Sequence, residues 1–156
     1  MKIIKLPRMD IKEIREALTN EKLCRIAFIE DNFPYISPFQ YVNIENTLYF
    51  HFTNYGKKKK ILKKNRNVCV YIEHFEKDLS HYFFISIQGE LILLDDSKEK
   101  NLVIQKILEE ARKQFSINFL TAHGFDKDKG WDTIKKENLL IYKLKEVGEP
   151  IGLKSL

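Results

Sequence analysis

The sequence predicts an α+β protein: a small, mainly antiparallel β-barrel of six strands with flanking helices. Three features of the chain support this class. Short apolar or aromatic segments recur along the sequence, and tight turns join most of them. Two segments of helical periodicity open with capping signals. Short strands joined by tight turns also favour a sheet that closes on itself.

The 156 residues are expected to form one domain that spans the chain. Hydrophobic residues make up 44% of the chain, which is enough to build a core. No apolar run approaches the ~20 residues of a membrane span, and the first ten residues lack the features of a signal peptide. We therefore expect a cytoplasmic protein with no membrane partner. Cys24 and Cys69 lie in apolar segments and are expected to be buried free thiols.

The first half of the chain predicts one helix and three strands. Asp10 and Glu13 have the spacing of a capping box, so a helix is expected to begin there and to extend to about Lys22. The strands are expected at residues 23–29, 35–44 and 48–53. Glu45-Asn46 has the length of a two-residue hairpin turn between the last two strands.

Pro38 lies inside the second of these strands. Proline has no backbone N–H to donate, so it predicts a sheet edge, a bulge or a point where strand pairing stops. At such a point the backbone could offer its polar groups to a ligand. An ordinary strand-entry proline is the alternative, and the pattern does not separate the two.

The second half of the chain predicts three more strands, at residues 68–73, 82–94 and 138–144. Asp96 and Glu99 form a second capping-box pattern, and apolar residues at helical spacing continue to about Gln114. A short helix is expected near residues 132–136. Gly89, inside the longest strand, predicts a bulge or the close approach of another backbone.

The stretch from Leu48 to Lys60 carries the clearest chemical pattern. An aromatic-rich strand ends at the turn Asn54-Tyr55-Gly56, and four consecutive lysines open the helical segment that follows. Free N–H groups and the positive end of the helix dipole can hold a phosphate there, and lysine adds a full charge. The spacing matches neither a Walker loop nor a dinucleotide-binding glycine turn. A hairpin end followed by solvated lysines is the alternative, and the local chemistry by itself favours it.

The positive charge of the chain is concentrated in this region. The net charge is +5, and seven basic residues lie within positions 57–66; removing them leaves 20 Lys and Arg against 22 Asp and Glu. A local basic patch suits a small phosphorylated ligand at least as well as a nucleic acid. Small barrels also bind single strands with aromatic residues beside a basic groove, so a nucleic-acid partner is a less favoured hypothesis.

The order of these segments resembles the FMN-binding split-barrel superfamily, which includes pyridoxamine 5′-phosphate oxidase and the nitroimidazole-resistance-type flavoproteins. The resemblance is closer to the second group and covers roughly residues 10–112. It comes from the order and spacing of several loose motifs. In this chain they read PYISP at 34–38, YFHFT at 49–53, GKK at 56–58, LKKN at 62–65, SIQG at 86–89, and Asp95-Asp96 with Glu99-Lys100.

The resemblance implies a homodimer with FMN bound at the subunit interface. It places the phosphate at Thr53, Lys57 and Lys58, which reverses the preference for a solvated lysine run. The backbones of residues 37–41 and 51–52 would lie along the flavin ring and its ribityl chain. The implied cofactor-binding residues are Ser37, Pro38, Phe39, Gln40, Tyr41, His51, Phe52, Thr53, Lys57, Lys58, Ser86 and Trp131.

Two of these residues have a second interpretation. A lone histidine on a strand, such as His51, is more often a packed residue; the resemblance makes it cofactor-binding and not a proton donor. Trp131 would cover the flavin of the partner subunit, and core packing is its alternative role. His74, His81 and His123 fall on expected loops without metal-ligand spacing, so no metal is predicted.

No serine-, cysteine- or carboxylate-based catalytic set is visible, so any chemistry should belong to the flavin. The leading hypothesis is an FMN-dependent oxidoreductase acting on a small electron acceptor, such as a nitroaromatic compound, with a small-molecule electron donor. A non-catalytic flavin carrier is the alternative, and haem or a deazaflavin could occupy the same cleft. Pyridoxamine 5′-phosphate oxidase has a C-terminal segment rich in arginine and tryptophan. No arginine follows Arg112 here, so vitamin B6 oxidation is not expected.

Overall fold

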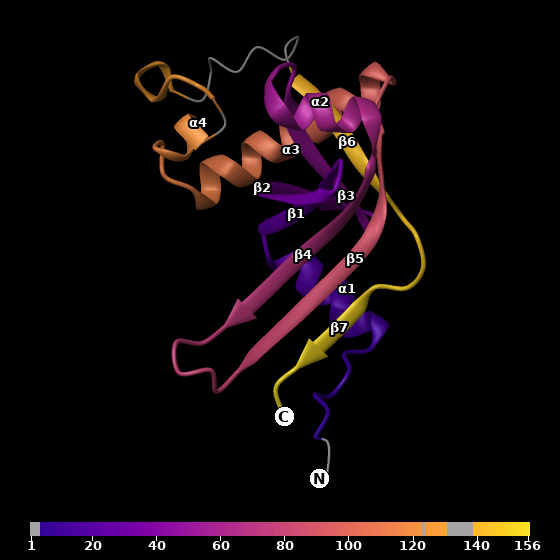
Figure 1. The fold of residues 1–156 in the computed structure, drawn as a ribbon. Coiled ribbons are helices and arrows are strands. Elements are labelled where there is room, and N and C mark those ends of the chain that lie inside the picture. The colour runs from indigo at the N-terminus through magenta and orange to yellow at the C-terminus, as the bar shows by residue number, and fades with distance from the viewer. Residues whose placement is uncertain (1–3, 123, 131–138) are drawn as a thin grey trace.

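The computed structural model describes residues 4–122, 124–130 and 139–156 and confirms the α+β class (Figure 1). The strands are β1 (Leu23–Glu30), β2 (Phe33–Ile44), β3 (Thr47–Thr53), β4 (Asn67–Phe75), β5 (Tyr82–Leu93), β6 (Leu139–Glu146) and β7 (Ile151–Lys154). The helices are α1 (Ile11–Asn20), α2 (Gly56–Lys64), α3 (Ser97–Gln114) and α4 (Phe119–Ala122), with a 3₁₀ turn at Lys127–Lys129. The helix expected near residues 132–136 lies outside the described residues.

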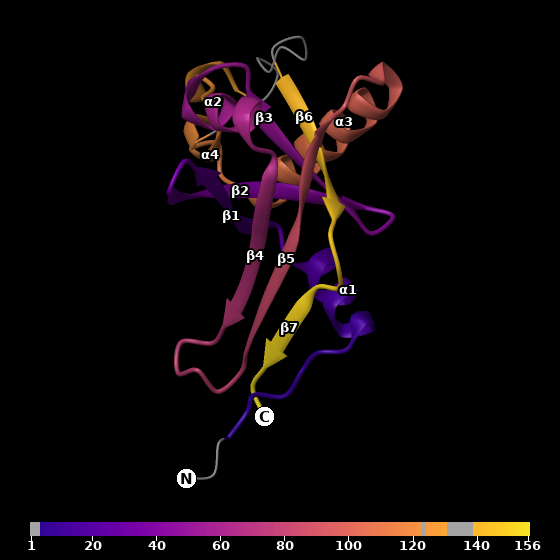
Figure 2. The same ribbon diagram turned by 45° about the vertical axis from the view of Figure 1, so that its right-hand side comes forward.

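Six antiparallel strands close into the predicted barrel, in the order β4-β1-β2-β3-β6-β5, with β5 pairing back to β4. The sequence prediction missed a seventh strand. β7 pairs with residues 83–86 of β5, on the part of that strand that extends past the barrel with β4 (Figure 2). β5 is long enough to serve three neighbours, because residues 89–93 pair with β6 while residues 82–90 pair with β4.

The predicted local signals have defined structural roles. The capping box of α1 is confirmed: the Asp10 carboxylate accepts a hydrogen bond from the Glu13 backbone N–H at 2.8 Å, and the reverse bond is 2.9 Å long. At α3, Asp96 accepts from the Glu99 backbone N–H at 2.7 Å. The Glu99 carboxylate accepts a hydrogen bond from the Tyr49 hydroxyl at 2.9 Å, which ties α3 to β3.

Two further turn and strand predictions are confirmed. Glu45 and Asn46 both have positive φ, at 50° and 63°, as a two-residue hairpin of the favoured hand requires. Gly89 is a close-approach position: a Cβ there would lie 2.6 Å from the Lys145 carbonyl oxygen and 2.7 Å from a Leu144 methyl carbon.

The core has two parts. The first fills the barrel, where the inward faces of the strands meet the apolar sides of α1 and α2. The second lies outside the barrel, where Val103 and Ile104 of α3 pack on Val42 and Ile141 of the sheet. Cys24 is buried in the first core, and Cys69 is half-buried on the outer side of β4. Within the described residues, no helix is both long and apolar enough to cross a membrane.

Candidate functional site

The candidate site lies where β2 separates from β3. Residues 33–40 of β2 pair with β1, whereas pairing with β3 involves residues 41–44. Pro38 therefore precedes the point where the β2–β3 ladder begins, which confirms the prediction of a stop in pairing. Beside this stretch, which pairs with β1 but not with β3, lies a cavity of about 470 Å³, within the size range of small-molecule sites.

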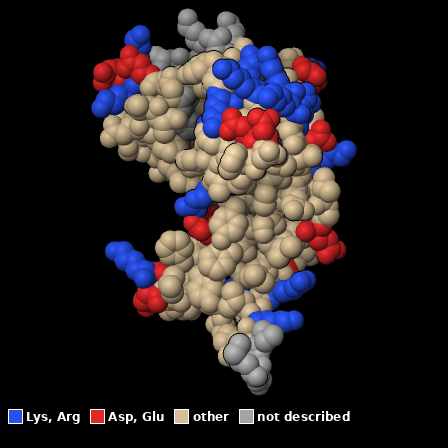
Figure 3. Space-filling view, viewed as in Figure 1, with Lys and Arg blue, Asp and Glu red and all other residues tan. Residues whose placement is uncertain are grey.

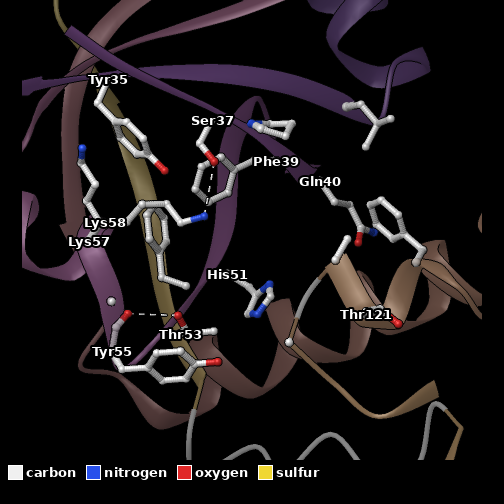
Figure 4. Close-up of a pocket in the computed structure, with 17 residues that line it drawn as sticks. Tyr35, Ser37, Phe39, Gln40, His51, Thr53, Tyr55, Lys57, Lys58 and Thr121 are labelled. Carbon is white, nitrogen blue, oxygen red and sulfur yellow. Dashed lines mark hydrogen bonds between the residues drawn. The ribbon is translucent and has the colours of Figure 1, made fainter. Parts of the chain in front are cut away.

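The cavity brings together nine of the twelve predicted cofactor-binding residues (Figure 4). These nine are Ser37, Pro38, Phe39, Gln40, His51, Phe52, Thr53, Lys57 and Lys58. They come from β2, from the end of β3 and from the first turn of α2. The strand-turn-helix arrangement predicted from Leu48–Lys60 therefore delivers its lysines to a cavity.

Lys58 is the least compensated charge in this cavity. Its ammonium group donates a hydrogen bond to the Ser37 hydroxyl oxygen at 3.3 Å and lies 4.9 Å from the centre of the Phe39 ring. Among the described residues it forms no ion pair with a carboxylate. Burial lowers the pKa of the Lys58 amine, because removal from water disfavours the charged form. An anion beside Lys58 would supply the missing countercharge.

Lys57 has a different environment. Its ammonium nitrogen lies 2.6 Å from a carboxylate oxygen of Glu30, and 4.5 Å from the centre of the Tyr35 ring. The Lys57 side chain is exposed, whereas Lys58 is half-buried. Lys57 therefore lines the cavity with a charge that Glu30 already balances.

The start of α2 adds backbone donors to the same end of the cavity. Gly56 has φ +88°, a left-handed conformation that glycine adopts without strain, and it turns the chain into the helix. Tyr55, the N-cap residue, makes no side-chain hydrogen bond to the first turn in the described structure. The first N–H groups of α2 have no side-chain cap there, so an anion could accept hydrogen bonds from them.

Aromatic residues line the cavity between these lysines and its far end. The Phe39 and Phe52 ring centres are 4.8 Å apart, and both side chains are buried. The His51 ring stacks on Phe125 at 6.1 Å with an interplanar angle of 25°. A positive end joined to an aromatic slot fits a flat ring that carries an anionic tail.

Of the other three predicted residues, Tyr41 and Ser86 do not line the cavity. The Tyr41 side chain is fully buried in the barrel and donates its hydroxyl to the Leu18 carbonyl oxygen at 3.0 Å, because strand alternation turns it inward. Ser86 lies on β5, paired with Tyr71 of β4 and Ile151 of β7. Trp131 lies outside the described residues.

The sequence reasoning missed part of the cavity wall. Tyr35 lies in the PYISP motif and Tyr55 in the turn before the lysines. Their position beside predicted cofactor-binding residues was the signal that could have identified them. The missed residues outside those motifs are Leu23, at the start of β1, and four residues from α4 and the turn after it. These four are Phe119, Thr121, Ala122 and Gly124, and they face the β2–α2 side across the cavity. No local pattern indicates that this segment folds back to the cavity. Within the described residues, no group of three or more His, Cys, Asp and Glu side chains could hold a metal ion.

Known structures share this architecture. A FAD-binding protein from Mesorhizobium loti is 17% identical, with a TM-score of 0.68 over 98% of this chain and all of the other. A candidate 5-nitroimidazole antibiotic resistance protein from Bacteroides thetaiotaomicron is 21% identical (TM-score 0.66, 96% and 90% covered). The haem storage protein from Vibrio cholerae is 16% identical (TM-score 0.62, 92% and 94% covered). At these identities the likeness establishes the fold.

The comparison with curated proteins gives no match. The family model described as pyridoxamine 5′-phosphate oxidase matches residues 10–126, which include every described residue that lines the cavity. This match covers most of the chain and both sides of the cavity. The protein therefore belongs to the pyridoxamine 5′-phosphate oxidase family.

Proposed function

We propose that the cavity binds FMN, either free or as the FMN unit of a larger flavin nucleotide. The observation that carries this proposal is the Lys58 ammonium, half-buried at the start of α2 without a carboxylate partner among the described residues. A phosphate dianion there would accept charge-assisted hydrogen bonds from Lys58 and from the first N–H groups of the helix. The flavin ring would then extend along Phe39, His51 and Phe52.

Family membership and the structural relatives support a flavin. One relative is described as FAD-binding and another as a candidate 5-nitroimidazole resistance protein. Bound flavin supplies hydride and single-electron transfer chemistry. The chain's own residues would bind the phosphate, hold the ring between aromatic side chains and restrict water at one face.

The proposed flavoprotein is a homodimer that uses the outer face of β1, β2, β4 and β5. Ile36 of β2 is 60% exposed and pairs across the sheet with Ala27 of β1. Figure 3 shows charged side chains gathered around the edges of a broad uncharged surface over β4 and β5. Such an apolar face is typical of a protein interface. Ser86 lies on this face, where a second copy would meet it.

The proposed activity is reduction of a small electron acceptor, with a nitroaromatic compound as the first substrate to test. The competing function is a flavin carrier. Anaerobic mixing of the FMN-loaded protein with NADH or NADPH, followed by a nitroaromatic compound, separates them. An oxidoreductase bleaches with a donor and recovers its colour with the acceptor, whereas a carrier keeps its oxidised spectrum with either donor.

A further inference from the structure

Gln40 presents a buried hydrogen-bond acceptor that has no donor among the described residues. Its side chain is only 4% exposed. The amide nitrogen Nε2 donates to the Ile107 carbonyl oxygen of α3 at 3.2 Å. The amide oxygen Oε1 is buried and has no hydrogen-bond partner among the residues that the structure describes.

The contact with Ile107 fixes the orientation of this amide. Rotating the Gln40 amide by half a turn would set Oε1 against the Ile107 carbonyl, and two acceptors cannot form a hydrogen bond. Nε2 must therefore face α3, which leaves Oε1 as an acceptor without a donor in the part of the chain that the structure describes. Gln40 lines the cavity on the side away from Lys57 and Lys58 (Figure 4).

A buried carbonyl oxygen without a donor has lost its hydrogen bonds to water and has formed no hydrogen bond that replaces them, which costs free energy. Side chains of this kind are rare in folded proteins and call for a partner that the chain alone does not supply. The position of Gln40 in the cavity points to a ligand as that partner.

We propose that Gln40 is a specificity-determining residue that selects a ring with an N–H donor at the end remote from the phosphate. In a flavin this donor is N3–H of the pyrimidine ring, which lies between two carbonyl groups. The role of Gln40 rests on the flavin proposed above. It adds that Oε1 accepts the N3–H hydrogen bond while Lys58 holds the phosphate.

The test compares FMN with FMN methylated at N3, which keeps the ring and phosphate but has no donor. Binding is measured by quenching of flavin fluorescence, for the wild type and for Gln40→Leu, whose side chain has a similar size. Asn43→Leu is the matched control. Asn43 also has a buried oxygen without a partner among the described residues, but it does not line the cavity.

The wild type is expected to prefer FMN over the methylated ligand by about 5- to 150-fold, the range for leaving a buried acceptor unsatisfied. Gln40→Leu should weaken FMN binding and reduce this preference to about twofold or less. Asn43→Leu should keep the wild-type preference.

Two results would overturn the role of Gln40: a wild type that binds both ligands within about twofold, or a Gln40→Leu variant with an undiminished preference. The wild-type comparison decides by itself if the variant does not fold. Failure of the wild type to bind FMN at all would overturn the proposed function together with this role. FMN binding without a preference overturns only the role of Gln40.

Discussion

Replacing Lys58 with alanine tests the proposed phosphate site most selectively. The Lys58 ammonium donates to the Ser37 hydroxyl at 3.3 Å and has no carboxylate partner among the described residues. Its positive charge is thus available to a ligand without breaking an existing ion pair. Lys58→Ala removes this charge and leaves the backbone of α2 in place, because alanine is a good helix former.

The expected magnitude follows from the surroundings of the two lysines. A hydrogen bond to a charged group contributes about 1.5–3 kcal/mol, so Lys58→Ala should weaken FMN binding about 10- to 150-fold. Lys57 must share its charge with Glu30, 2.6 Å away, and its side chain is exposed. An exposed ion pair contributes about 0–1 kcal/mol, so Lys57→Ala should cause a loss of about fivefold at most.

Fluorescence titration with FMN and with riboflavin, which has no phosphate, provides the measurement. Lys58→Ala should weaken the binding of FMN and leave that of riboflavin nearly unchanged. Lys60→Ala is the charge-matched control, since Lys60 lies on the same helix but does not line the cavity. The phosphate assignment is refuted if Lys58→Ala and Lys60→Ala bind FMN equally well, or if Lys58→Ala weakens FMN and riboflavin by the same factor.

Three further predictions concern pH, packing and assembly. Because burial lowers the pKa of Lys58, FMN affinity should fall as the pH rises through that lowered pKa. It should also fall below about pH 6, where the phosphate gains a proton; a titration series in pH checks both limits. In the ligand-free protein, the unfolded chain binds the Lys58 proton more tightly than the folded chain does. The stability of the free protein should therefore rise as the pH rises from the lowered pKa of Lys58 to the ordinary pKa of lysine. Gly89→Ala should destabilise the fold by about 1–3 kcal/mol through the clash with Lys145, seen as a lower midpoint of thermal unfolding. Ile36→Asp should convert the proposed dimer to a monomer in sedimentation analysis, with an unchanged circular dichroism spectrum; a persistent dimer would contradict the assigned interface.

Local signals predicted most of the fold. The capping residue Asp10, the hairpin pair Glu45-Asn46 and the apolar strand segments act through neighbours in the sequence, so their structures could be read from short windows. β7 was missed for the opposite reason. It has four residues, and its partner strand lies about 70 residues earlier in the chain, so only the assembled sheet defines it as a strand.

The cavity likewise combines residues that local motifs predict with residues that only long-range packing places. Ser37 lies in the PYISP motif, and Lys57 and Lys58 lie in the GKK motif. The resemblance to split-barrel flavoproteins placed the two motifs at one cofactor site. The opposite wall, formed by Phe119, Thr121, Ala122 and Gly124, follows α3, and no short pattern encodes the packing of α3 on the sheet. The sequence also carried no sign that the Gln40 oxygen lacks a donor among the described residues, because this depends on the contact with Ile107.

The visible absorption spectrum of the purified protein, taken after incubation with FMN and removal of free ligand by gel filtration, tests the central claim most directly. We expect the flavin bands to elute with the protein and the bound flavin to be released on denaturation. A colourless protein peak, with all of the FMN eluting as small molecule, would contradict the account.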